Sequence, residues 1–182
     1  EGLEVFVHMR DRDGLFAAIV IGLDRAGLAI LQARALDGPD ATIFDTFHVL
    51  PNDPRQVPTP LQIETGLQRV LAGDLGRVLP ARRRQPRHLR HFRIAPQVEF
   101  ADAVAGRTRL SIVCNDRPGL LADIARVLRE QRLRVHDARI ATFGERAEDL
   151  FLVSDEHDHS LQPAQRDALR DALLAALDGE PR

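Results

Sequence analysis

The chain has 182 residues, a formal net charge of −2, 44% hydrophobic residues and 29% charged residues, a composition typical of a globular protein with a packed core. No window approaches the ~20 consecutive apolar residues of a membrane-spanning helix, and no basic-then-apolar signal opens the chain. A single cysteine, Cys114, excludes an internal disulfide, so we expect a reducing cytoplasm.

The first elements alternate between strand and helix patterns. Residues 3–9 are predominantly apolar and predict a strand, and a short acidic turn ending in Gly14 follows them. Apolar residues then recur every four positions from Leu15, which predicts a helix with one buried face. Two further strands are expected near residues 28–30 and over 41–50.

A second helix is predicted to begin at Thr59-Pro60-Leu61-Gln62, because this segment combines a capping box with proline at the first helical position. Residues 79–95 then hold six arginines and no acid, between two mildly acidic blocks. We expect 81–96 to be a basic connector, in which residues 90–95 supply an edge strand to the first unit.

The chain then repeats itself. When Gly14 is aligned with Gly119, Asp11 falls on Asp116 and Arg12 on Arg117, and the match continues through the helix and the second strand. Two domains are therefore expected, 1–80 and 97–182. The chain begins with Glu1 rather than methionine, and we expect these domains to belong to a longer protein.

The second domain ends too soon to supply its own last strand. Its final helix, opened by Gln162-Pro163, runs almost to the end of the chain. The alternating residues 97–102 precede the domain's first long strand, and the segment between them contains Gly106, which favours a hairpin. We therefore predict that residues 97–102 pair antiparallel with residues 107–114 and occupy the missing edge.

The acidic glycine turns have a structural and a functional interpretation. Asn115 or Asp116 could cap the following helix, with Gly119 at a positive φ. The same atoms fit a free amino acid, with its α-carboxylate on the amides of residues 119–121 and its α-ammonium on Asp116. Both interpretations remain open from the residues alone.

The ordered motifs resemble a known family. "DRPGLLADIARVL", with "VHDARIATFGERAEDLFLV" after it, is similar to ACT domains, the small-molecule sensors of amino-acid metabolism. The connector and second unit, "RQPRHLRHFRIAPQVEFADAVAGRTRLSIVCNDRPGLLA" and "GERAEDLFLV", resemble the C-terminal tandem ACT region of bifunctional uridylyltransferase/uridylyl-removing enzymes. The resemblance runs from about residue 3 to about residue 177.

The resemblance implies an α+β fold of two ferredoxin-like (βαββαβ) ACT domains, each with a four-stranded antiparallel sheet and helices on one face. It implies that the chain binds glutamine and controls uridylyltransferase and uridylyl-removing activities on the nitrogen-signalling protein PII. The nucleotidyltransferase and hydrolase domains would precede this chain and need a divalent metal and UTP there. No cofactor is expected in this chain, and a homodimer through the sheets is expected.

The family also indicates where the effector would bind, between the strand–helix turn of one domain and the second strand of its neighbour. Asp13 stands where the second unit has Pro118, and Arg134 replaces a short polar residue common in the family. The residues that the resemblance assigns to ligand binding are Asp11, Arg12, Asp13, Gly14, Leu15, Gln32, Asn115, Asp116, Arg117, Pro118, Gly119, Leu120, Leu121 and Asp137.

Other patterns in the sequence give weaker indications of a function. The arginine-rich connector has no interleaved aromatic residues beyond Phe92, so we expect neither nucleic acid nor membrane as a partner. His157 and His159 are expected in a polar surface loop rather than at a metal, and no catalytic centre is expected in this chain. The alternatives that stay open are an ACT sensor for another amino acid and a purely structural interaction module.

Overall fold

The computed structural model describes residues 2–81 and 94–178. The first unit begins with strand β1 (Leu3–Arg10), which confirms the strand expected at residues 3–9, and its exposure alternates residue by residue. Helix α1 (Leu15–Arg25), strands β2 (Leu28–Arg34) and β3 (Thr42–Pro51), and helix α2 (Pro60–Ala72) follow. Among the described residues these strands form an antiparallel sheet in the order β1-β3-β2.

The second unit opens with the predicted hairpin. Strand β4 (Gln97–Ala103) pairs antiparallel with β5 (Arg107–Asn115), with Val98 opposite Ile112, which confirms the edge strand expected from the N-terminal side. Helix α3 (Leu120–Glu130), strands β6 (Arg134–Phe143) and β7 (Arg146–Ser154), and helix α4 (Pro163–Leu177) complete it. The sheet order is β4-β5-β7-β6, so the fourth strand lies at the edge but comes first in the chain.

The edge strand expected for the first unit falls mainly outside the described residues, which resume at Ile94. Ile94 and Ala95 are not in a strand, and the Ile94 amide donates a hydrogen bond to Asn115 Oδ1 at 2.8 Å. This contact ties the end of the connector to the second unit, so a strand at 90–95 in the first sheet stays a prediction.

Helices α2 and α4 begin as their sequences predict. The Thr59 hydroxyl accepts from the Gln62 amide while the Gln62 side chain accepts from the Thr59 amide, and Gln162 with Gln165 repeats this capping box. Helices α1 and α3 begin differently, at Gly14 and Gly119 with no side-chain cap. At α3 the Leu120 amide donates to the Arg117 carbonyl at 3.1 Å, and Gly119 lies in the left-handed region, so the structure shows a backbone closure of this turn.

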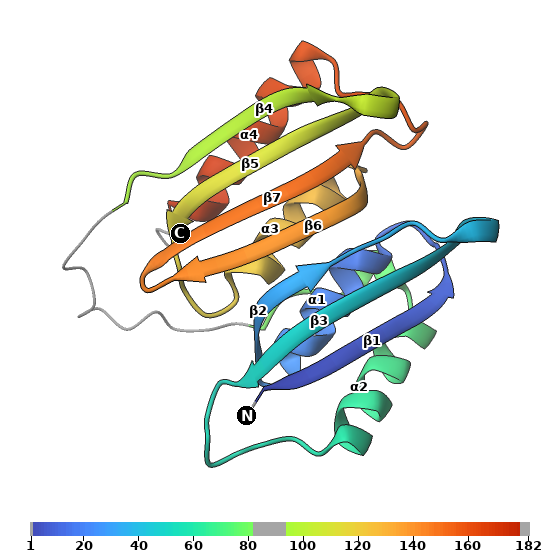
Figure 1. Cartoon of the computed structure of the whole chain (residues 1–182), viewed down its shortest axis with the longest axis vertical. Coiled ribbons are helices and arrows are strands. Elements are labelled where there is room, and N and C mark those ends of the chain that lie inside the picture. The colour runs from blue at the N-terminus through green and yellow to red at the C-terminus, as the bar shows by residue number, and fades with distance from the viewer. Residues whose placement is uncertain (1, 82–93, 179–182) are drawn as a thin grey trace.

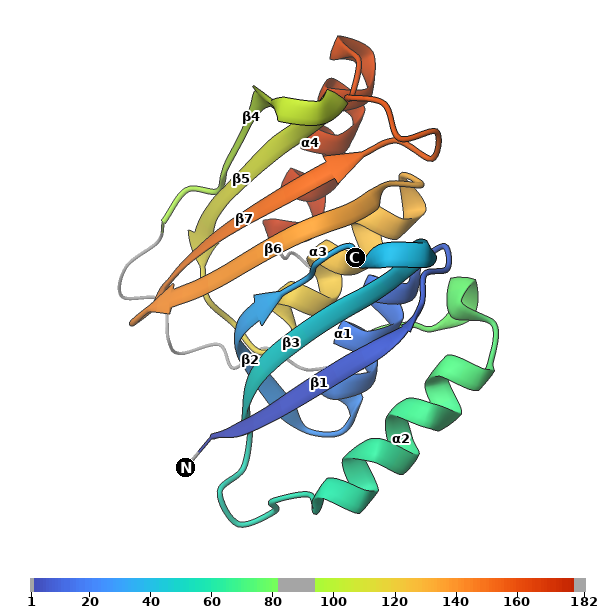
Figure 2. The ribbon, with the colours of Figure 1, turned by 45° about the vertical axis from the view of Figure 1, so that its right-hand side comes forward.

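The two units pack side by side with their helices on the same face (Figure 1). Strand β2 of the first unit lies beside β6 of the second, and α1 lies beside α3, an arrangement that the turned view also shows (Figure 2). Phe16 of α1 contacts Phe151 of β7 edge-on, with 6.4 Å between ring centroids. The buried apolar side chains form one cluster across both units. Of the described helices, none is long and apolar enough to cross a membrane.

Candidate functional site

In the part of the chain that the structure describes, a cavity lies at each of the two strand–helix turns, at the junction of the units. The first, which we call the acidic cavity, has a volume of about 150 Å³. It lies between the second unit's turn and the start of β2 in the first unit. Its lining residues are Val20, Asp24, Leu28, Ala29, Ile30, Leu31, Asn52, 116–122, Ile140, Thr142, Ala147 and Asp149.

The second, which we call the arginine cavity, has a volume of about 660 Å³ and lies between the first unit's turn and the start of β6. Its lining residues are 11–17, 73–76, Ala125, Leu128, Arg129, 132–135 and Glu156. Each cavity therefore combines the turn of one unit with the second strand of the other, which is the position that the family resemblance implies for an effector.

The glycine at each turn has the backbone geometry that the sequence predicts. Gly119 has a φ of 80° and Gly14 a φ of 76°, values that other residues rarely adopt. A Cβ on Gly119 would lie 3.8 Å from Asp24 Oδ1, on the far wall of the acidic cavity. The glycine thus brings the N-terminus of α3 close to residues of the first unit.

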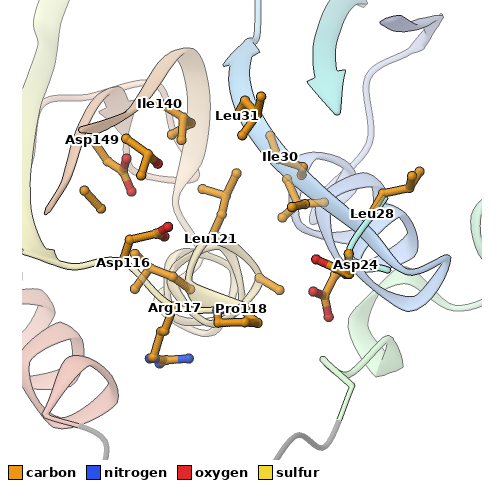
Figure 3. Close-up of a pocket in the computed structure, with 18 residues that line it drawn as sticks. Asp24, Leu28, Ile30, Leu31, Asp116, Arg117, Pro118, Leu121, Ile140 and Asp149 are labelled. Carbon is orange, nitrogen blue, oxygen red and sulfur yellow. The ribbon is translucent and has the colours of Figure 1, made fainter. Parts of the chain in front are cut away.

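Three carboxylates surround the acidic cavity. Asp116 and Asp149 lie on one side, and Asp24 reaches in from α1 on the other, with Leu121 between them (Figure 3). Asp149 is only 4% exposed, and its Oδ1 has no hydrogen-bond partner among the described residues. An unpaired, buried carboxylate oxygen is costly, so it marks a place where a donor from a ligand would be stabilised.

Burial changes the titration of both acids on that side. Burial and then the neighbouring Asp116 carboxylate raise the pKa of Asp149 to about 7, against a hydrogen bond from the Ala141 backbone. Burial also raises the pKa of Asp116, which the Arg117 backbone and charge oppose. The Asp116 carboxylate therefore disfavours ionisation of Asp149, and a cation placed between them would favour it.

Arg117 lines this cavity, but its guanidinium is already engaged. It forms a 2.6 Å ion pair with Asp123 and donates to the Ala176 carbonyl at 3.2 Å. The Leu120 amide likewise donates to the Arg117 carbonyl at 3.1 Å. The Leu120 amide is one of the three amides expected to hold a carboxylate. For the other two, those of Gly119 and Leu121, the first helical turn provides no acceptor.

The structure brings the predicted turn residues to the cavities but not the predicted strand residues. Residues 116–121 line the acidic cavity and 11–15 the arginine cavity, whereas Asn115, Gln32 and Asp137 are not among the lining residues that the described chain provides. A β-bulge separates Ile30 from Gln32, and another separates Val135 from Asp137. Residues 28–31 and 132–135, around the start of each second strand, line the cavities instead.

Sequence reasoning missed Asp24 and Asp149. Asp24 is the residue after Leu23 on the predicted helix face, and it reaches the cavity only because α1 packs beside α3. Asp149 did carry a signal: the other inward positions of its strand near it, 147, 151 and 153, are apolar, and Asp45 stands at the matching position of the first unit. Both acids are buried, with 4% and 2% exposure.

The histidines at 157 and 159 lie on the surface, as expected. Their side chains are 72% and 75% exposed, and the backbone amides of both residues donate to Asp155.

Cys114 is buried in β5, and burial raises the pKa of its thiol to about 12, which leaves it unreactive.

Comparison with known proteins identifies the second unit. Residues 108–172 match the family model described as "ACT domain". The chain is 61% identical over 179 residues to the "Bifunctional uridylyltransferase/uridylyl-removing enzyme" of Xanthomonas campestris pv. campestris (strain B100), covering 98% of this chain and 21% of that protein. It is 36% identical over 179 residues to the protein of the same name from Photobacterium profundum, covering 97% and 20%.

Among solved structures, aspartate kinase from Synechocystis shares 16% identity with a TM-score of 0.48, covering 96% of this chain and 27% of that one. The chain spans about a fifth of the length of the curated relatives it matches. It thus carries an ACT domain and is similar to the C-terminal region of these enzymes, and the antiparallel, helix-backed fold expected from the sequence is confirmed.

Proposed function

We propose that this regulatory ACT region senses a free amino acid, glutamine, in the acidic cavity, and thereby controls the uridylyltransferase and uridylyl-removing activities of a longer enzyme on the protein PII. The observation that carries the proposal is the unpartnered Asp149 oxygen beside the N-terminus of α3. The relatives' names support the enzyme assignment. The family resemblance suggests glutamine and PII.

The cavity's two kinds of polar group match the two charges of an amino acid. Asp116 and Asp149 would hold the α-ammonium, because a cation between them satisfies the orphaned oxygen and relieves their repulsion. The Gly119 and Leu121 amides at the N-terminus of α3 would hold the α-carboxylate. Leu28, Ile30 and Leu121 provide apolar walls for side-chain methylenes.

The charge of the cavity favours glutamine over glutamate. Asp24, Asp116 and Asp149 line it, while the one cation among its described lining residues, Arg117, is paired with Asp123. A second carboxylate on the ligand would be repelled there, whereas a neutral carboxamide could bond to Asn52 or Thr142 on the lining. Such discrimination is what a sensor of nitrogen supply requires.

Calorimetric titration with glutamine, glutamate and the other amino acids tests the site. We expect glutamine to bind, glutamate to bind at least about tenfold more weakly, and Asp149→Asn to abolish binding. Asp45→Asn is the matched control, because Asp45 is equally buried, has a pKa raised to about 7 by burial, and does not line the acidic cavity. If another amino acid binds instead, the glutamine assignment is wrong.

The regulatory part needs the full-length protein. Asp149→Asn should leave basal uridylylation of PII intact but make both activities insensitive to glutamine. If no amino acid binds the wild-type region, and substitutions on its surface rather than in the cavity change the activities, the region is an interaction module and the sensing proposal fails.

A further inference from the structure

The two cavities are built alike at their turns. The Asp11 amide donates to Ala41 O at 2.7 Å and the Asp116 amide to Glu145 O at 2.8 Å, so each acid is fixed by the hairpin beyond it. The glycines three residues later have φ values within a few degrees of each other. Behind each turn, a buried aspartate, Asp45 or Asp149, has an oxygen without a hydrogen-bond partner among the described residues.

The walls opposite the turns differ in charge. In the repeat alignment, Asp24, Gly27 and Ala29 of the first unit correspond to Arg129, Arg132 and Arg134 of the second. The acidic cavity therefore faces an aspartate and an alanine, whereas the arginine cavity faces three arginines.

One of these arginines, Arg134, forms an ion pair with the turn acid Asp11. Arg134 Nη2 lies 2.8 Å from Asp11 Oδ2, and its Nη1 lies 2.8 Å from Asp158 Oδ2. The hydrogen bond to Asp11 raises the pKa of Arg134, so the guanidinium remains charged. In the acidic cavity, the position that corresponds to Arg134 is Ala29, and the described lining residues bring no arginine from the opposite wall to the Asp116 carboxylate.

A second arginine packs against the turn glycine. A Cβ on Gly14 would lie 3.0 Å from Arg129 Cδ, and Arg129 Nη1 donates to the Leu75 carbonyl at 2.8 Å. Backbone space at this turn is therefore taken by a side chain of the protein, whereas the corresponding space at Gly119 faces Asp24 at 3.8 Å.

We propose that the arginine cavity is a copy of the acidic cavity that is already occupied by a side chain of the protein. In the arginine cavity the Arg134 guanidinium binds Asp11, just as an effector's ammonium binds Asp116 in the acidic cavity. The inference rests on the proposed function of the acidic cavity. Arg134 and Ala29 are then the residues that set specificity: one closes the first turn to amino acids, and the other leaves the second open. The junction has a built-in ion pair at one end and an effector-dependent one at the other.

Chemical rescue tests the Arg134 part without any amino acid. Arg134→Ala should lower the melting temperature, and millimolar methylguanidinium should restore it in a saturable way, because the free cation can refill the place on Asp11. The double variant Asp11→Asn/Arg134→Ala should not be rescued. An Arg134→Ala protein as stable as wild type, or equal rescue of the double variant, overturns the proposal.

The reciprocal substitution tests whether the two cavities are equivalent. Ala29→Arg should place a guanidinium on Asp116 and reduce glutamine affinity by about 100-fold or more, with the melting temperature unchanged or raised. Ala29→Met, of similar length without charge, should lose much less affinity. Equal losses of glutamine affinity in the two variants would overturn the proposal that a positive charge is what closes the cavity. If wild type binds no amino acid at all, the proposed function fails, while the rescue result still decides the role of Arg134.

Discussion

His136 Nδ1 lies 2.6 Å from Asp37 Oδ2, so a ring on β6 of the second unit contacts a carboxylate from the segment after β2 of the first. The other ring nitrogen lies 2.7 Å from Ser154 Oγ. The order acid–histidine–serine is that of a hydrolase triad, but Ser154 is 0% exposed and its hydroxyl meets no substrate. The three residues instead fasten the two units together.

His136→Ala should destabilise the fold by about 1–3 kcal/mol, because it leaves the buried Ser154 hydroxyl and the Asp37 carboxylate without this partner. Urea unfolding followed by circular dichroism measures the loss. His157→Ala is the control, since that side chain is 72% exposed and its removal should change stability little. Equal stability of the two variants would mean that this network does not hold the units together.

Stability should fall as pH rises from about 5 to about 8. Burial raises the pKa of Asp149 to about 7 from its ordinary value of 3.8, so in this range the folded state holds a proton that the unfolded chain has lost. That contribution is present at low pH and is lost as the pH rises through 7. Asp149→Asn should flatten the profile by on the order of 1 kcal/mol per pH unit between 5 and 7, while Asp171→Asn, an exposed change on α4, should not.

Effector affinity should move in the opposite direction. An ammonium between Asp116 and Asp149 binds best when both carboxyls are ionised, and burial raises the pKa of each. Calorimetry in buffers of different ionisation enthalpy should therefore show proton release on glutamine binding at pH 6, and tighter binding at pH 8. Asp45→Asn should keep this dependence. A pH-independent affinity would place the ammonium elsewhere.

Gly119→Val should weaken glutamine binding beyond its effect on folding. A branched side chain at a φ of 80° costs about 2 kcal/mol and also projects into the acidic cavity toward Asp24. Gly106→Val, at a φ of 68° in the β4–β5 turn, should cost similar stability without affecting binding. Thermal unfolding with and without ligand separates the two effects; loss of binding in both variants would indicate an indirect cause.

Val98→Asp should detach β4 and expose the edge of β5. Val98 is 8% exposed and pairs with Ile112, so a charge there would cost at least about 2 kcal/mol. Size-exclusion chromatography should show oligomers or aggregates, because a bare edge strand templates pairing. Glu99→Gln, one residue on and exposed, should remain like wild type. A monomeric Val98→Asp protein would show that the edge needs no cover.

Much of the fold followed from local patterns. The apolar run of residues 3–9, the period-two alternation of residues 97–102 and the capping box at Thr59 specify elements through neighbours a few positions away, so they could be predicted without coordinates. The positive φ at Gly14 and Gly119 follows from the same kind of reasoning. Whether Asn115 or Asp116 caps α3 could not be decided in this way, because a backbone closure was equally compatible with that sequence.

By itself, then, the sequence determined the elements, the hairpin that completes the second sheet, and the turns around which both cavities form. Only the tertiary structure decided which residues face them. The bulges before Gln32 and Asp137 shift each second strand by one position, and this exchanges the side of the sheet on which a side chain lies. The packing of α1 beside α3 brings Asp24 to a turn almost a hundred residues away, and β6 brings Arg134 to Asp11. Such contacts depend on how two separately patterned units meet, and no local periodicity records that.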